Sequence, residues 1–166
     1  MFATNTQSSD YSHSEKKFIS FKLGLKDIAL LPLECIAELF QVSIGDILPV
    51  PETPNCVLGI YNWREEILWL LDINVLTGFP GITQQESLLT IMAMVVQVEG
   101  KFLGLLVPQV KDIEVLDLQN MKIPDRQLFK EELMPFLQGY LIGKDNEILR
   151  ILNPEAISQV NLWSQK

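Results

Sequence analysis

Residues 66–72 read EILWLLD, at the end of the longer stretch GIYNWREEILWLLD that begins at Gly59. The same pattern returns as EILRILN at 147–153, and a glycine, Gly139, again precedes it. Apolar runs of this length, bounded by turn residues, are typical of buried strands. The recurrence predicts one structural module that the chain uses twice.

A strand and its return strand open each half of the chain. Residues 18–26 alternate between apolar and polar side chains, with Ile19, Phe21, Leu23 and Leu25 on one face and Ser20, Lys22 and Gly24 on the other. A period of two indicates a half-buried strand. Lys26 and Asp27 can turn it into 28–33. In the second half, 90–98 and 102–107 form the same pair around a Glu99-Gly100 turn.

The remaining parts also follow one order in both halves. Each hairpin precedes an apolar segment with an acidic member, at 36–39 and at 113–116, and then a proline-bearing loop. The glycine and the repeated strand come next. Short strands at this spacing predict a mainly β protein made of two five-stranded barrels, with lobes at about 17–80 and 88–153.

Three strands are apolar on both faces, which a strand of an isolated small barrel is not expected to be. They are 67–71, 88–96 and 103–107. We therefore expect the two lobes to pack against each other around a shared core.

The two ends of the chain differ from its middle. Residues 1–16 are polar and are predicted to be a disordered tail. The chain closes with a predicted helix at 154–163, which Asn153 caps and Pro154 begins. A second short helix is expected at 125–133. The domain itself is predicted to span 17–166.

Composition excludes several classes of function. The 166 residues suffice for one domain with its own core. A net charge of −8 disfavours nucleic acid and anionic membrane surfaces as partners. The longest uncharged apolar run, 87–98, is shorter than the roughly 20 residues of a membrane span. Two cysteines, Cys35 and Cys56, favour a cytoplasmic protein without disulfides.

The sequence offers no active site, metal site or cofactor motif. Its single histidine, His13, lies in the predicted tail, so no histidine can serve as an acid or base inside the fold. Cys and His residues are too few for a zinc site. Asp112 and Glu114 would share a strand face, as a two-carboxylate hydrolase requires, but nothing near them suggests a tuned pKa. We predict that the protein is not an enzyme.

Asn62, Trp63 and Arg64 stand directly before the repeated strand and have no counterpart in its second copy. Trp and Arg dominate the binding energy of many interfaces, and the arginine fork recognises carboxylates and carbonyls. The alternative is structural, with Arg64 bridging Glu65 or Glu38. Both interpretations remain open at this stage.

These segments resemble the CheW family of chemotaxis coupling proteins. The resemblance covers about residues 17–160. It is carried by 57–64 followed by 67–72, with support from LPL at 31–33 leading into IAEL at 36–39, LPVP at 48–51, GLLV at 104–107 and LNPE at 152–155. The sequence around Trp63 resembles that of cyanobacterial members that serve phototaxis and twitching motility.

The resemblance implies a pair of five-stranded SH3-like barrels and a non-catalytic adaptor in the cytoplasm, associated with membrane receptor arrays. The implied partners are the regulatory domain of a CheA-type histidine kinase and the cytoplasmic tip of a methyl-accepting chemoreceptor or photoreceptor. The residues that the resemblance places in these contacts are Ile36, Glu38, Val50, Val57, Leu58, Asn62, Trp63 and Arg64.

Three positions depart from the family pattern. Glu65 replaces a glycine after the arginine, Pro108 replaces an aspartate after the 103–107 strand, and Asn153 replaces the terminal aspartate. These changes leave the fold intact but put partner specificity in question. A different class of function is a stand-alone barrel that binds a small apolar molecule between its lobes.

Overall fold

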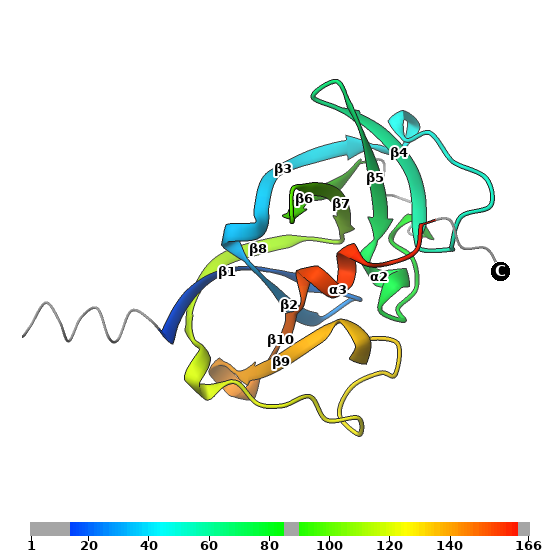
Figure 1. Ribbon diagram of the computed structural model, residues 1–166. Helices are drawn as coiled ribbons and strands as arrows, with labels where there is room; N and C mark the ends of the chain where they lie inside the picture. Colours follow the sequence, from blue (N-terminus) through cyan, green and yellow to red (C-terminus); the bar gives the residue numbers. More distant parts are fainter. Residues whose placement is uncertain (1–13, 85–89, 163–166) are drawn as a thin grey trace, which may run out of the picture.

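The computed structural model describes residues 14–84 and 90–162. Within them, ten strands form two five-stranded sheets, each curved into a lobe (Figure 1). The sheet of lobe 1 has the order β3-β6-β7-β5-β4, and that of lobe 2 has the order β8-β1-β2-β10-β9. Lobe 1 contains β3 (Ile36–Ser43), β4 (Val57–Trp63), β5 (Glu66–Asp72), β6 (Thr90–Val98) and β7 (Lys101–Val107). Lobe 2 contains β1 (Glu15–Leu23), β2 (Asp27–Pro32), β8 (Val110–Asp117), β9 (Leu137–Ile142) and β10 (Ile148–Leu152).

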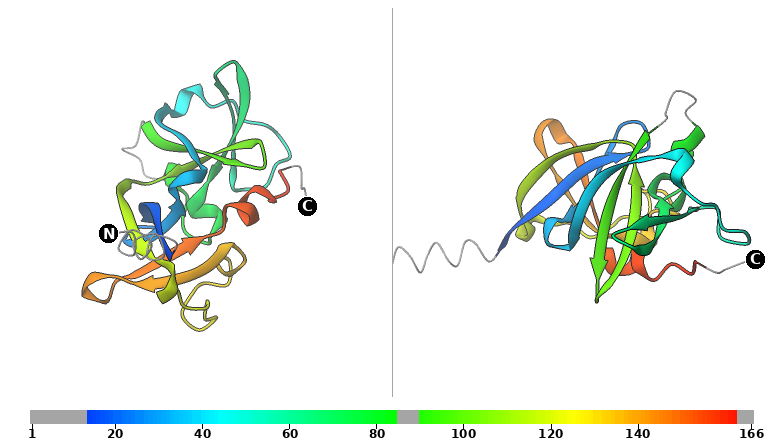
Figure 2. Two further views of the ribbon diagram at one scale, coloured as in Figure 1. Left: turned by 60° about the vertical axis from the view of Figure 1, so that its left-hand side comes forward. Right: turned by 90° about the horizontal axis from the view of Figure 1, so that it is seen from above.

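Two short α-helices follow the repeated strands. Helix α2 (Ile73–Leu76) comes directly after β5, and α3 (Pro154–Ser158) comes after β10. In both views of Figure 2, as in Figure 1, α3 lies where the two lobes meet. Single 3-10 turns occupy the connections at Leu33–Cys35, Ile44–Asp46, Ile82–Gln84, Leu118–Asn120, Met134–Phe136 and Lys144–Asn146.

The first hairpin of each half pairs with strands of the other half. β1 and β2 join β8, β9 and β10, while β6 and β7 join β3, β4 and β5. The lobes predicted at 17–80 and 88–153 are therefore wrong for both hairpins, although the repeated order of parts is right. Alternation shows which residues of a strand are buried but not which strand lies beside it.

Exchange of the hairpins explains the one parallel pairing in each sheet. β5 runs parallel to β7 through Leu70 and Gly104, and β10 runs parallel to β2 through Arg150 and Ala29. Parallel neighbours cannot be joined by a tight turn, so they must come from separate parts of the chain. Neither half of the sequence can complete a sheet without the other.

The glycine before each repeated strand lets another segment cross closely. The incoming loop bridges β4 at Leu48 and Ile60, and the equivalent loop bridges β9 at Lys122 and Tyr140. A Cβ added to Gly59 would lie 2.2 Å from the Leu48 carbonyl oxygen, and one added to Gly139 would lie 2.7 Å from that of Lys122. The repeated sequence pattern thus corresponds to one structural feature that occurs twice, a loop that crosses closely over a glycine.

A single core connects the lobes, as the doubly apolar strands predict. One cluster of buried side chains includes Phe21 and Leu31 of lobe 2 together with Met94 and Leu105 of lobe 1. Strand β2 is buried on both faces, because Ala29 and Leu31 face this shared core while Ile28 and Leu30 fill lobe 2. Side chains from both lobes therefore pack against one another in this shared core.

Several details differ from the sequence-based expectations. Leu25 does not continue the buried face of β1, because the strand ends at Leu23 and Leu25 is 82% exposed in the turn. Ile67 is 69% exposed, although 67–71 was expected to be buried on both faces. Residues 125–133 form turns without a helix, and α3 ends at Ser158. β1 begins at Glu15, within the predicted tail, while His13 and Trp163 lie outside the described residues.

In the described part of the chain, no helix is long and apolar enough to cross a membrane.

Candidate functional site

A two-residue turn between β4 and β5 presents Arg64 to solvent. Trp63 pairs with Glu66 at the end of the hairpin, so Arg64 and Glu65 form the whole turn. Their φ angles are 50° and 64°, the left-handed values that type I′ hairpin turns require at both central positions. Glu65 thus adopts a left-handed conformation, which favours glycine, and the two-residue turn forms with glutamate at this position.

Glu38 holds this turn from β3, the strand at the other edge of the same sheet. An irregularity between Ile36 and Glu38 shifts the pairing of β3 with β6, and such bulges redirect side chains. One carboxylate oxygen, Oε1, accepts a hydrogen bond from Trp63 Nε1 at 2.9 Å and lies 2.9 Å from a guanidinium nitrogen of Arg64. The arginine also lies over the Trp63 ring, 4.7 Å from its centroid.

The structure shows the expected bridge from Arg64 to Glu38 and leaves the arginine exposed. Its ion pair is with Glu38, yet 64% of its side chain remains exposed. Trp63 is different from the expectation, because it is only 6% exposed and packs on Phe102 with ring centroids 5.0 Å apart. Trp63 cannot be the presented aromatic residue. It is the buried support on which Glu38 and Arg64 are arranged.

An apolar surface with an acidic border lies beside the turn, at the end of lobe 1. Its centre is formed by Leu48 and Ile67, which are 63% and 69% exposed. They line a depression of about 380 Å³ together with Asp46, Ile60, Tyr61, Asn62, Glu65 and Glu66. We call this surface the apolar-acidic end. Exposed apolar side chains gathered in this way are typical of protein-binding surfaces.

The other predicted contact residues are spread over lobe 1. Ile36 is half-buried and packs against the shared core, and Val57 is 9% exposed. Leu58 is half-buried on β4, while Val50 lies in the proline-bearing loop. Only Asn62 belongs to the apolar-acidic end. Sequence reasoning missed Leu48 and Ile67 there, since an apolar residue in a β-rich sequence is assigned to the core by default.

The buried ionisable groups of the described residues serve the fold. Asp72 is 1% exposed, and its carboxylate caps α2 by accepting from the backbone N–H groups of Asn74 and Val75. Its other oxygen accepts from the N–H of Ile82 at 2.8 Å. Burial raises the pKa of Asp72, and burial raises the pKa of the Cys35 thiol to about 11. A thiol with this pKa is a poor nucleophile at neutral pH.

The two carboxylates considered for hydrolysis do not converge on a common partner, because that of Asp112 accepts from the N–H of Ile113 while that of Glu114 lies near Ser20 of β1. The Ser20 hydroxyl donates to the Asp112 backbone oxygen at 3.1 Å and lies 3.3 Å from a carboxylate oxygen of Glu114. The described residues contain no group of three or more His, Cys, Asp or Glu side chains that could hold a metal ion.

The turn makes one stability prediction. Replacing Glu65 by glycine should raise the free energy of unfolding by about 0.5–1 kcal/mol, because glycine adopts positive φ without the steric cost of a Cβ. Glu66 is the matched control, since it carries the same charge at the next position but lies in β5. Glu66→Gly should lower stability by a similar amount. Chemical denaturation of both variants measures the difference, and a destabilised Glu65→Gly protein would contradict the prediction.

These features define a class of protein: a double β-barrel that presents an arginine held by Glu38, with exposed apolar side chains beside it. The chain belongs to the CheW-like domain family, whose match spans residues 17–161. A search of curated proteins gives no match. Among solved structures, the chain is similar to the scaffolding protein TtCheW from Thermoanaerobacter tengcongensis, with a TM-score of 0.74 and 21% sequence identity. That similarity covers 91% of this chain and 97% of the other, and it confirms the predicted fold of two SH3-like barrels.

Proposed function

We propose that this protein is a non-catalytic adaptor that couples methyl-accepting receptors to a CheA-type histidine kinase. The observation that carries the proposal is the exposed Arg64 guanidinium, which a buried tryptophan and Glu38 hold in place within a CheW-like fold. An adaptor of this kind acts by differential contact energy, since a receptor state that it binds more tightly shifts the kinase bound beside it.

The receptor contact is proposed to centre on Arg64. Its ion pair with Glu38 fixes the side chain while leaving donors free on the exposed side of the planar guanidinium. Glu38 and Asn62 flank it, and Trp63 acts beneath the surface. A receptor tip that offers carboxylates or backbone carbonyls is the partner chemistry that this arrangement fits.

The kinase contact is proposed to use the apolar-acidic end. Val50, Val57 and Leu58 were candidates from the sequence, but Leu48 and Ile67 expose far more apolar surface. The acidic side chains of Asp46, Glu65 and Glu66 would favour a partner surface with apolar and basic residues. Binding both a receptor and a kinase would place the protein in the cytoplasm at receptor arrays. It would serve chemotaxis or a phototaxis and twitching-motility system.

Two variants separate the contacts. Arg64→Ala should weaken binding to a purified receptor signalling domain by about tenfold or more, since truncating a central interface arginine costs about 1–3 kcal/mol. Ile67→Ser should instead weaken binding to the purified kinase regulatory domain. Isothermal titration calorimetry of each variant with each partner measures both effects.

Stability provides the control for this experiment. Arg64→Ala should change the free energy of unfolding by less than about 1 kcal/mol, because an exposed ion pair contributes little. Leu25→Ser removes an apolar side chain that is more exposed than Ile67, at 82% against 69%, in the β1–β2 turn of lobe 2, and this variant should bind both partners normally. If Arg64→Ala unfolds readily, or binds the receptor as the parent does, the arginine is only a structural bridge.

A further inference from the structure

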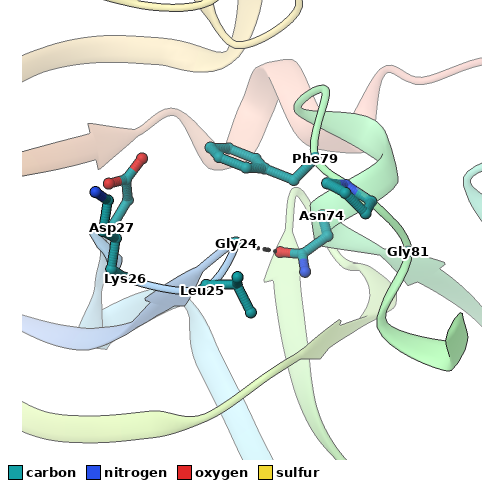
Figure 3. A pocket seen from close by; sticks show the side chains of 8 residues that line it. Gly24, Leu25, Lys26, Asp27, Asn74, Phe79 and Gly81 are labelled. Atoms are coloured by element: carbon teal, nitrogen blue, oxygen red, sulfur yellow. Dashed lines mark hydrogen bonds between the residues drawn. The ribbon is translucent and has the colours of Figure 1, made fainter. Parts of the chain in front are cut away.

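A second depression lies at the seam between the lobes, away from Arg64 and the apolar-acidic end. It has a volume of about 520 Å³, within the usual range for small-molecule pockets. The turn between β1 and β2 supplies one side, and the segment that follows α2 supplies the other (Figure 3). Its lining comprises Gly24, Leu25, Lys26, Asp27, Asn74, Phe79, Pro80 and Gly81. A ligand here would contact both lobes at once.

The Phe79 side of the depression is built as a fixed wall. Gly24 has a φ of 66°, and a Cβ at this position would lie 2.6 Å from the Phe79 ring. The ring therefore packs directly on the glycine. Lys130 lies over the same ring at 4.4 Å, and its ammonium donates to the Gly78 carbonyl oxygen at 2.9 Å. These contacts leave Phe79 little freedom to collapse into the depression.

Asn74 gives the pocket a buried amide group whose nitrogen can still donate hydrogen bonds. The residue is 4% exposed, and its carboxamide oxygen accepts from the Gly24 N–H at 2.9 Å. Figure 3 shows the amide nitrogen on the side of the carboxamide away from Gly24. Within residues 14–84 and 90–162, no group accepts a hydrogen bond from that nitrogen. Burying an unpaired donor costs about 1–3 kcal/mol, which a ligand with an acceptor oxygen would recover.

The rim of the depression combines an apolar arm with a free positive charge. Leu25 is 82% exposed at the tip of the turn, where its side chain can fold over a bound apolar group. Lys26 is exposed and has no ion pair among the described residues. The neighbouring acid, Asp27, is paired with Arg150 at 3.4 Å. The uncompensated charge at the rim is therefore positive, which favours an anionic head group.

We infer that this pocket binds a small apolar carboxylate, such as a medium-chain fatty acid. The hydrocarbon part would lie on Phe79, Pro80 and Leu25. The carboxylate would accept from the Asn74 amide nitrogen, and the positive charge of Lys26, which Figure 3 shows on the opposite side of the depression from Asn74, would attract the anion from the rim. The inference is independent of the adaptor role, since none of these residues belongs to the proposed receptor or kinase contacts. Because the ligand would join the lobes, its binding would stabilise the whole fold by mass action.

The test is a titration of the ¹⁵N-labelled full chain with decanoate below its micelle concentration. We expect saturable shifts of the Gly24 amide and of the Asn74 side-chain NH₂ signals, together with a raised Tm. Decanol and decyltrimethylammonium, with the same chain length but no carboxylate, should bind at least about fivefold more weakly. No saturable shift at these two groups would overturn the inference. Equal binding of decanol would overturn the assignment of a carboxylate.

Exposed variants keep the test independent of folding. Lys26→Glu should lower decanoate affinity by about fivefold or more, since it reverses the charge at the rim. Lys17→Glu makes the same change at the other end of β1 and should bind as the parent does. Leu25→Ser should also weaken binding. Equal losses in Lys26→Glu and Lys17→Glu would show a general charge effect and contradict the proposed site.

Discussion

Replacing Asp72 by alanine is expected to lower the free energy of unfolding by about 3 kcal/mol. Three backbone N–H groups, those of Asn74, Val75 and Ile82, would lose their acceptor. Each buried donor left unpaired costs about 1–3 kcal/mol, and the relief from burying a carboxylate offsets part of the sum. Urea denaturation followed by circular dichroism measures the loss.

The second copy of the module supplies matched controls. Asn153 occupies the equivalent position and caps α3 by accepting from the N–H groups of Glu155 and Ala156. Asp72→Asn should therefore keep the cap and lose only the bond to Ile82, with an intermediate loss of about 1–2 kcal/mol. Asn153→Ala should cost about 1 kcal/mol, as a partly exposed cap does. Equal losses for Asp72→Ala and Asp72→Asn would contradict this division of roles.

The stabilities of the parent protein and of Asp72→Asn should also depend differently on pH. Burial raises the pKa of Asp72 above its ordinary value of 3.8, so the folded state holds the proton more tightly than the unfolded chain does. Between those two pKa values, this group makes stability increase as pH falls. The advantage of the parent over Asp72→Asn should therefore grow when pH is lowered from 7 toward 4. If the difference in free energy of unfolding between the parent and Asp72→Asn stayed constant over that range, the raised pKa of Asp72 would be contradicted.

Replacing Gly59 by alanine is expected to lower the free energy of unfolding by about 3–4 kcal/mol. The new Cβ would lie 2.2 Å from the Leu48 carbonyl oxygen, and the glycine φ of 147° is unfavourable for other residues. Overpacking and backbone strain each cost about 1–3 kcal/mol. The two hydrogen bonds between Leu48 and Ile60, both 2.9 Å long, must stretch to accommodate it. A fall of roughly 10 °C in Tm should follow for a chain of this size.

Gly45 is the control for this substitution. A Cβ there would meet no atom within 4 Å, so Gly45→Ala should be neutral or stabilise by up to about 1 kcal/mol. Gly139→Ala should repeat the Gly59 effect in lobe 2, because its Cβ would contact the Lys122 carbonyl oxygen. Differential scanning calorimetry of the three variants tests whether the close loop crossings at Gly59 and Gly139 require glycine. A Gly59→Ala protein as stable as Gly45→Ala would show that the crossing loop adjusts freely.

The repeat predicted the module correctly but could not predict how the modules assemble. EILWLLD and EILRILN occupy equivalent strands, β5 and β10, and each is followed by a capped helix. The exchange of hairpins depends on which apolar faces meet in three dimensions. Alternation therefore assigns buried positions without naming the partner strand.

The candidate site shows the same limit at the level of single residues. Sequence reasoning identified Glu38 and Arg64 and left open whether they pair. It placed Trp63 at the surface because tryptophan beside arginine is common in interfaces. The indole is buried instead, because it packs on Phe102 in the core, and Glu38 accepts from its N–H. Leu48 lies in the loop that follows β3, and Ile67 lies in the β4–β5 hairpin. Their exposure depends on how these two segments are placed on lobe 1, which the local sequence does not encode.

The most direct test of the adaptor role is whether this chain joins kinase to receptor. Membranes that carry a methyl-accepting receptor are sedimented with a CheA-type kinase, with and without the purified chain, and the kinase in the pellet is measured. We expect kinase to sediment when the chain is present, and much less kinase to sediment when the Arg64→Ala variant replaces it. Kinase recovery that does not change on addition of the parent chain would contradict the adaptor role.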